Sequence, residues 1–185
     1  MQSILVRDMM IPIKDYAAVS EDATLYEAVK ALKEAQIKFD LSPYHHRAVL
    51  VYDANGKIVG KLSQLDGLKS LEPKYEDVFN PEGMDRFGIN QEYIRKMIRE
   101  LGLLKPPLDD ICRIAAAVKV KNIMHSPTEG EYISETASLS EAVLLLVVGS
   151  HQSLLVTRNK EIVGILRLSD VFKKISDLIE SCKIV

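Results

Sequence analysis

Residues 57–68 read KIVGKLSQLDGL, and residues 161–172 read EIVGILRLSDVF. Both stretches contain Ile-Val-Gly, and both place an aspartate six residues after the glycine. They differ most visibly at one position, where the first stretch has Ser63 and the second has Arg167. Two such similar stretches in one chain of 185 residues indicate an internal duplication.

The similarity extends over most of the first and last thirds of the chain. At an offset of 114 residues, VRDMM (6–10) meets VKNIM (120–124), and SEDATLYEAV (20–29) meets SETASLSEAV (134–143). Beyond these segments the offset falls to 104, because the first copy carries ten extra residues around KFDLSPYHHR. Matching over about 65 residues is too dense to arise by chance.

The sequence pattern predicts the same order of elements in each copy: strand, helix, strand, strand, helix. A capping box opens the first helix of each copy, as TLYE at 24–27 and SLSE at 138–141. Turn residues at 55–56 and 159–160 join the two strands of a hairpin. Because each copy is too small to bury its apolar faces alone, we expect the two copies to pack sheet to sheet as one domain.

We therefore predict a mixed α/β fold in which two β-α-β-β-α repeats form one module with a pseudo-twofold axis. The predicted boundaries are 1–71 for the first repeat, 72–118 for a helical insertion and 119–185 for the second repeat. Within the insertion, apolar residues at helical spacing predict helices over 89–104 and 108–118. We expect the insertion to cover an edge of the domain or to contact a second subunit.

Composition and charge exclude several classes of protein. With 24 basic and 26 acidic residues the net charge is −2, so we expect no binding of nucleic acid. The longest apolar run, Ala142–Val148, is far shorter than the roughly 20 residues that cross a bilayer. We expect this run to be a buried helix, between the repeats or in a dimer seam. Cys112 and Cys182 match no metal or redox spacing, and no signal peptide is evident, so we expect a cytoplasmic protein.

The openings (VRDMM and VKNIM), the helix starts and the strand-to-helix turns (IVGKLSQLD and IVGILRLSD) occur in the same order twice. This arrangement resembles a tandem pair of cystathionine-beta-synthase (CBS) domains, or Bateman module, over roughly 130 of the 185 residues. The resemblance implies a module without catalysis or a required cofactor. It implies that adenosine-containing ligands (AMP, ADP, ATP or S-adenosylmethionine) bind in two clefts between the repeats. It also implies a homodimer, assembled head-to-head or head-to-tail.

The first strand-to-helix turn is the stronger candidate site. The resemblance implies that Asp66 binds the ribose hydroxyls and that Ser63 reaches a phosphate. The residues support this reading, because a strand ends and a helix begins at Ser63, where free backbone N–H groups favour an anion. Gly60 leaves room for a flat base beside the strand. An alternative stays open, since Ser-x-x-Asp is also a plain capping box.

The second turn departs from the family pattern. Arg167 replaces the hydroxyl residue, while Asp170 keeps the ribose carboxylate. Either the guanidinium supplies its own fork to a phosphate, or the long side chain fills the cleft. We favour an altered but usable site.

Four basic residues precede the central strands. The resemblance implies that His45, His46 and Arg47 point towards phosphates, and we place His151 of the second copy at the position of Arg47. The alternative is a solvated loop with chance histidines. No carboxylate or thiolate is placed to complete a metal site with them.

Two functions compete. The first is a regulatory module that senses a nucleotide between its repeats and signals to an unknown partner by changing conformation. The alternative is a structural or interaction protein with degenerate clefts, which acts through its dimer and insertion surfaces. We do not expect an enzyme, because the sequence carries no nucleophile triad, phosphate-binding glycine loop or metal cluster.

Overall fold

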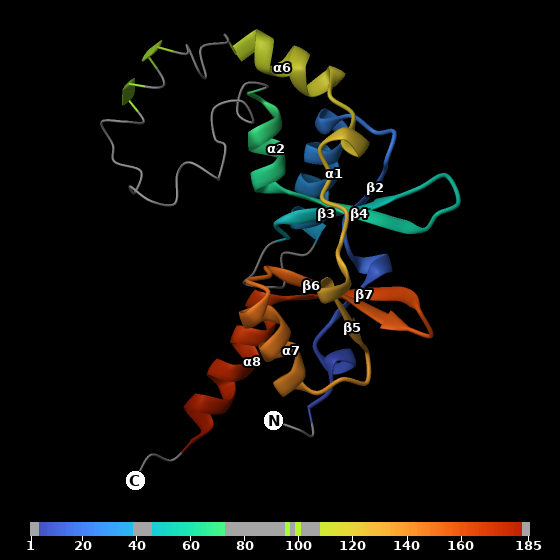
Figure 1. The fold of residues 1–185 in the computed structure, drawn as a ribbon, viewed down its shortest axis with the longest axis vertical. Coiled ribbons are helices and arrows are strands. Elements are labelled where there is room, and N and C mark those ends of the chain that lie inside the picture. Colours follow the sequence, from blue (N-terminus) through green and yellow to red (C-terminus); the bar gives the residue numbers. More distant parts are fainter. Residues whose placement is uncertain (1–3, 39–45, 73–94, 97–98, 101–107, 183–185) are drawn as a thin grey trace.

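The computed structural model of the protein describes residues 4–38, 46–72, 95–96, 99–100 and 108–182. Two small sheets face each other in the middle of the molecule, and helices cover their outer sides (Figure 1). The predicted mixed α/β fold with two similar halves is confirmed.

The first repeat contains a three-stranded sheet in the order β2-β3-β4 and two helices. Strand β2 runs parallel to β3, and β3 forms an antiparallel hairpin with β4. The elements are β2 (Ala18–Ser20), α1 (Leu25–Lys38), β3 (Ala48–Tyr52), β4 (Ile58–Ser63) and α2 (Gln64–Ser70).

The second repeat has the same order of elements and one additional strand. Strands β5, β6 and β7 pair as β2, β3 and β4 do, and β1 joins the sheet antiparallel to β7. The elements are β1 (Ile11–Pro12), β5 (Tyr132–Ser134), α7 (Leu139–Val148), β6 (Ser153–Arg158), β7 (Glu161–Arg167) and α8 (Leu168–Ser181). Short 3₁₀ turns precede the two repeats at η1 (Val6–Asp8), η2 (Ile13–Asp15), η3 (Val120–Asn122) and η4 (Glu129–Glu131).

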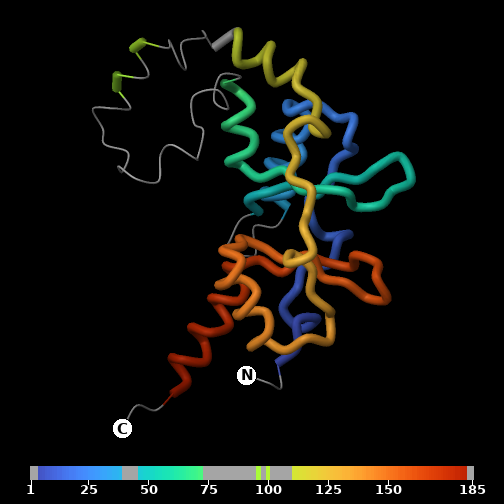
Figure 2. Tube along the Cα trace, in the orientation of Figure 1, coloured from blue at the N-terminus to red at the C-terminus, as the bar shows by residue number. Residues whose placement is uncertain are grey.

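Each repeat's opening segment packs on the other repeat. We call residues 4–12 the first opening and residues 118–125 the second opening. The Val6 backbone N donates to the Ala137 carbonyl at 2.9 Å, and the Val120 backbone N donates to the Ala23 carbonyl at 2.9 Å. In Figure 2 the blue first opening runs beside the orange second repeat, and the gold chain crosses beside the first repeat. The two halves therefore share their cores across the junction.

The exchanged openings explain the repeated Ile-Val-Gly. A Cβ added to Gly60 would lie 2.6 Å from the Met124 Sδ, and one added to Gly164 would lie 2.7 Å from the Ile11 carbonyl oxygen. Each glycine therefore lies where the opening of the other half crosses the strand, and a larger residue would push that segment away.

Replacing Gly164 with alanine is therefore expected to lower the free energy of unfolding by about 1–3 kcal/mol, because the crossing atom is backbone and gives way poorly. Urea unfolding measures the loss. Gly67→Ala is the matched control, since a Cβ there meets only Leu25 at 3.5 Å. Equal unfolding midpoints for the two variants would contradict the packing explanation.

Three apolar clusters hold the molecule together. One fills each repeat beneath its helices, with Val6 in the core of the second repeat and Val120 in the core of the first. The third lies between the sheets and contains Ile11, Tyr16, Leu50, Leu155 and Ile165. Because this cluster takes residues from both sheets, the repeats form one packed unit, as expected.

Helix α6 (Leu108–Ala117) is the described helix of the predicted insertion. It lies over α1, with Ala115 and Val118 packed against the core of the first repeat. The other predicted helix, 89–104, falls mostly outside the described residues. No helix in the described parts is long and apolar enough to span a membrane.

The apolar run in α7 differs from the prediction. Ala142 and Leu146 are buried, but Leu144, Val147 and Val148 are 61–76% exposed in the single chain. The location between the repeats is therefore wrong, and the alternative location, a dimer seam, stays a prediction. One of its faces packs on the sheet, and the other is open.

Candidate ligand site at two strand-to-helix corners

Each repeat has a corner where its last strand ends and its last helix begins. We call Ser63 and Asp66, between β4 and α2, the first corner. Arg167 and Asp170, between β7 and α8, form the second corner. The two pairs occupy matching positions, because Ser63 is opposite Ala48 in the first hairpin and Arg167 is opposite Ser153 in the second.

The first corner is a complete capping box. The Ser63 backbone N donates to the Asp66 Oδ2 at 2.9 Å, and its Oγ donates to the same oxygen at 2.6 Å. In return, the Asp66 backbone N donates to the Ser63 Oγ at 3.2 Å. The local cap that the sequence predicted is therefore present. Among the described residues, the other carboxylate oxygen, Oδ1, receives no hydrogen bond, so it is open to a further donor.

The second corner is bonded differently. The Arg167 Nε donates to the Asp170 Oδ2, and its Nη2 donates to Oδ1, each at 2.6 Å. This is a bidentate fork that uses both carboxylate oxygens. The Arg167 side chain is 7% exposed and that of Asp170 is 16% exposed. The cap of the first corner is thus replaced by a nearly buried ion pair.

An aromatic residue of the first repeat adjoins the second corner. Tyr16 is buried, and its ring meets the buried His46 ring edge-on, with centroids 4.3 Å apart. Burial raises the pKa of Tyr16 to about 12, and the charges of Arg167 and Asp170 also act on it. His46 therefore belongs to a packed interior rather than to an open phosphate site.

His45 lies outside the described residues, and the remaining basic residues, Arg47 and His151, lie near the starts of the central strands. The Arg47 side chain is exposed, and its backbone carbonyl accepts a hydrogen bond from Gln64 at the start of α2. The corresponding bond in the second repeat is accepted by Gln152, so His151 matches His46 and not Arg47. The predicted match was wrong by one residue, because the second hairpin turn is one residue shorter.

The space that the sequence assigned to a ligand base beside Gly60 is occupied. The Met124 side chain and the His125 carbonyl lie there, within 2.6–3.2 Å of the position of an added Cβ. This contact accounts for Gly60 without a ligand.

A buried ion cluster, which joins Lys61 of β4 to His125 and Glu131, was not predicted. Glu131 is 2% exposed and accepts hydrogen bonds from the Lys61 Nζ and from the backbone N of Thr128. Lys61 bonds to the Oε2 of Glu131, and the His125 Nε2 lies 2.5 Å from the other carboxylate oxygen, Oε1. Burial would raise the pKa of Glu131, but the hydrogen bonds from Lys61 and His125 outweigh it and lower this pKa to about 2. The Thr-x-x-Glu spacing was visible in the sequence, but nothing there indicated its burial against Lys61.

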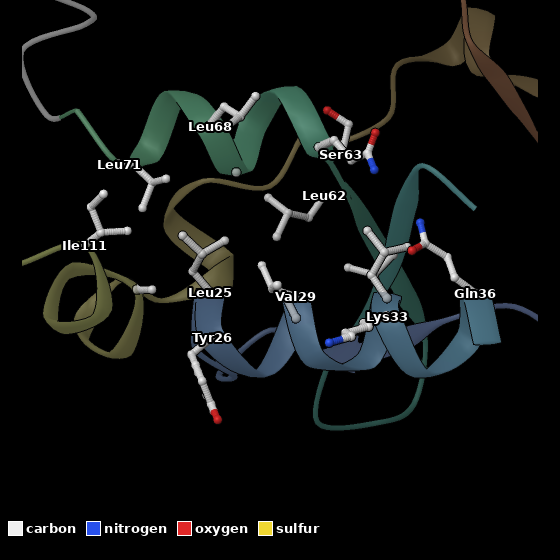
Figure 3. A pocket seen from close by; sticks show the side chains of 16 residues that line it. Leu25, Tyr26, Val29, Lys33, Gln36, Leu62, Ser63, Leu68, Leu71 and Ile111 are labelled. Atoms are coloured by element: carbon white, nitrogen blue, oxygen red, sulfur yellow. The ribbon is translucent and has the colours of Figure 1, made fainter. Parts of the chain in front are cut away.

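An apolar groove lies between α1, α2 and α6. Its volume is about 790 Å³. Figure 3 shows Leu25, Leu62 and Leu68 lining the space between the helices, with Ser63 and Gln36 at one end. The groove is open to solvent and lies next to the first corner.

Metal-ligating residues do not gather in the described ranges. No group of three His, Cys, Asp or Glu side chains within them could hold a metal ion. The chemistry that the corners offer is therefore that of carboxylates, hydroxyls and a guanidinium: recognition of hydroxyl groups and anions.

The family model of the CBS domain matches the chain twice, at residues 6–72 and 120–177. The chain belongs to the CBS-domain family. The two matches make it a tandem CBS pair, as the resemblance in the sequence indicated. No curated protein matches its sequence.

Solved structures share the fold of this CBS pair. The CBS domain of a membrane protein from Sphaerobacter thermophilus is 18% identical with a TM-score of 0.62, over 94% of this chain and 88% of that chain. CBSX2, a CBS-pair protein of Arabidopsis thaliana, was solved in complex with AMP. It is 18% identical with a TM-score of 0.57, over 96% of this chain and 99% of that chain. The CBS domain of a bacterial CNNM/CorC-family Mg2+ transporter was solved in complex with ATP. It is 18% identical with a TM-score of 0.59, over 95% of this chain and 89% of that chain.

Proposed function

We propose that this CBS pair is a regulatory, non-catalytic module that binds an adenosine-containing nucleotide at the first corner. The observation that carries the proposal is the state of Asp66: one of its oxygens holds the helix cap, and the other is open to the paired hydroxyls of a ribose. Relatives with this fold were solved with AMP and with ATP, which supports an adenine nucleotide as the ligand.

The signal to a partner protein follows from the way the halves are joined. Lys61, two residues before Ser63, exchanges backbone hydrogen bonds of 3.0 and 2.9 Å with His125 of the second opening, so a ligand at the first corner would lie beside a junction that both repeats share. A change in their angle then biases whatever protein binds the module, to the extent that the ligand prefers one state. The competing function is an interaction protein whose corners bind nothing.

A thermal-unfolding panel separates these functions. AMP, ADP, ATP and S-adenosylmethionine are each titrated against the full chain. Binding at 100 times Kd is expected to stabilise the protein by about 2.7 kcal/mol, which corresponds to a rise in Tm of about 2–4 °C per kcal/mol for a protein of this size. In Asp66→Ala this rise is expected to disappear.

The control for the lost cap is Glu27→Ala. Glu27 makes the equivalent box at the start of α1, where the Thr24 backbone N donates to it at 2.6 Å. This variant loses a comparable cap away from the corner and should keep the full response to nucleotide. A panel in which no compound raises the Tm of the unmodified protein would favour the interaction protein.

We also propose that the module forms a homodimer through an apolar helix face. The face consists of large apolar side chains that are 36–76% exposed: Tyr26, Val29, Leu65, Leu68, Leu144, Val147, Val148, Leu168, Phe172 and Ile179. Figure 1 shows α2, α7 and α8 on the side of the molecule away from the two hairpin turns. A surface of this kind on four helices, with an open groove in it, suits a second copy that brings the same apolar residues.

A further inference from the structure

The two corners of this CBS pair differ in how far the protein's own side chains fill them. In the second corner the Arg167 guanidinium is forked onto Asp170 by two bonds of 2.6 Å. The pair is nearly withdrawn from water, with 7% and 16% of the two side chains exposed. Both oxygens of Asp170 are held by the guanidinium and little of the side chain meets water, so a ligand hydroxyl would have to compete with Arg167 for the carboxylate, and moving Arg167 aside would separate a nearly buried ion pair.

A second group fills the same corner from the opposite repeat. Tyr16 is 7% exposed and packs in the cluster between the sheets that contains Ile165. Ile165 and Arg167 lie two residues apart on β7, so their side chains share the face of the strand that this cluster covers. Its ring rests on His46, which is fully buried. An aromatic ring and a planar cation thus occupy the second corner together.

The first corner carries small residues at the matching positions. Ser63 stands where the second corner has Arg167. At the offset of 114 residues, Gly130 stands where the other half has Tyr16. The His151 Nε2 lies 3.8 Å from the position of a Cβ on Gly130, which repeats the contact of Tyr16 with His46. The first corner therefore has the same backbone arrangement as the second, but lacks the Tyr16 ring and the Arg167 guanidinium.

From this difference we infer that the chain binds one nucleotide and not two: the second corner is closed by its own Tyr16 and Arg167, which take the places that a ring and a charged group of a ligand would need. The inference rests on the proposed function and specifies which of the two corners serves it. It departs from the altered but usable site that we favoured from the sequence, and takes the other reading, in which the Arg167 side chain fills the cleft.

Isothermal titration calorimetry of the full chain with AMP, and separately with ATP, tests the inference. One nucleotide per chain is expected, and Asp66→Ala should weaken its binding at least tenfold. The double variant Tyr16→Gly/Arg167→Ser copies the first corner into the second and should bind two nucleotides per chain. Adding Asp66→Ala to that variant should return the number to one.

The reciprocal variant requires no opening of the second corner. Ser63→Arg would place the same Arg-x-x-Asp fork in the first corner and should abolish binding, while circular dichroism reports whether the fold is kept. Two nucleotides per unmodified chain, or full binding by a folded Ser63→Arg variant, would overturn the inference and leave the proposed function standing. No binding by the unmodified chain would overturn both.

Discussion

Replacing Lys61 with methionine is expected to lower the free energy of unfolding by about 3–5 kcal/mol at neutral pH. The Lys61 side chain is 14% exposed and that of its partner Glu131 is 3% exposed. Methionine keeps the apolar stem but leaves the Glu131 carboxylate buried, with His125 and Thr128 as its remaining partners among the described residues. Urea unfolding at pH 7 measures the loss, and a cost below about 1 kcal/mol would mean that the pair behaves like a surface ion pair.

The pH dependence has a definite sign. The pKa of Glu131 is lowered in the folded protein from 4.5 to about 2, so its ionised form stabilises the fold. This contribution is complete above pH 4.5 and is lost as the pH falls from 4.5 towards 2. Without Lys61 the folded-state pKa of Glu131 should rise, so the deficit of Lys61→Met should shrink as the solution is acidified.

The equivalent pair of residues in the other half of the molecule suggests a double variant that should restore the stability lost in Lys61→Met. In the duplication, Ile165 of the second repeat corresponds to Lys61, and Ala17 of the first repeat corresponds to Glu131. The equivalent pair in the other half of the molecule is therefore uncharged. The double change Lys61→Ile/Glu131→Ala removes both charges together and should recover most of the stability lost in Lys61→Met. A double variant no more stable than the single one would show that the deficit comes from lost packing.

Replacing Phe172 with aspartate is expected to convert the proposed homodimer into a monomer. Phe172 is 63% exposed on α8 in the single chain, so a charge there costs the isolated subunit little but would be buried without a partner in the dimer. Light scattering after size exclusion should fall from twice the chain mass of 20.7 kDa to that mass. Lys173→Ala, the exposed neighbour on the same helix, should leave the dimer intact.

A single mass of 20.7 kDa for the unmodified protein at micromolar concentration would contradict the dimer. If both variants dissociate equally, the effect comes from α8 as a whole and not from its apolar side. Either outcome leaves the nucleotide proposal to be judged by the titrations alone.

Local patterns in the sequence predicted the elements, but of the predicted box at 138–141 the described residues show only the bond from the Glu141 backbone N to the Ser138 Oγ, at 3.3 Å. The Ser63–Asp66 and Thr24–Glu27 boxes are both present, because capping depends on residues three apart and on little else. The hairpin turn at Asn159-Lys160 is also found, with both residues at positive φ.

Long-range features could not be read in the same way. The openings VRDMM and VKNIM are similar to each other, so nothing in them indicates that each packs on the other repeat. The one-residue difference between hairpin turns shifted the match of His151, since alignment from the glycines alone does not see the turn. The burial of Glu131 depends on Lys61, 70 residues away in the chain.

The exchanged openings also bear on how such a chain could have arisen. If one repeat were made alone, its core would lack the valine that the other half supplies, and its own opening segment would have no partner within the chain. Two copies would then satisfy each other by domain swapping, as a twofold-symmetric pair. The present molecule has the geometry of such an ancestral pair after gene fusion, which freed one of its two formerly identical corners to change.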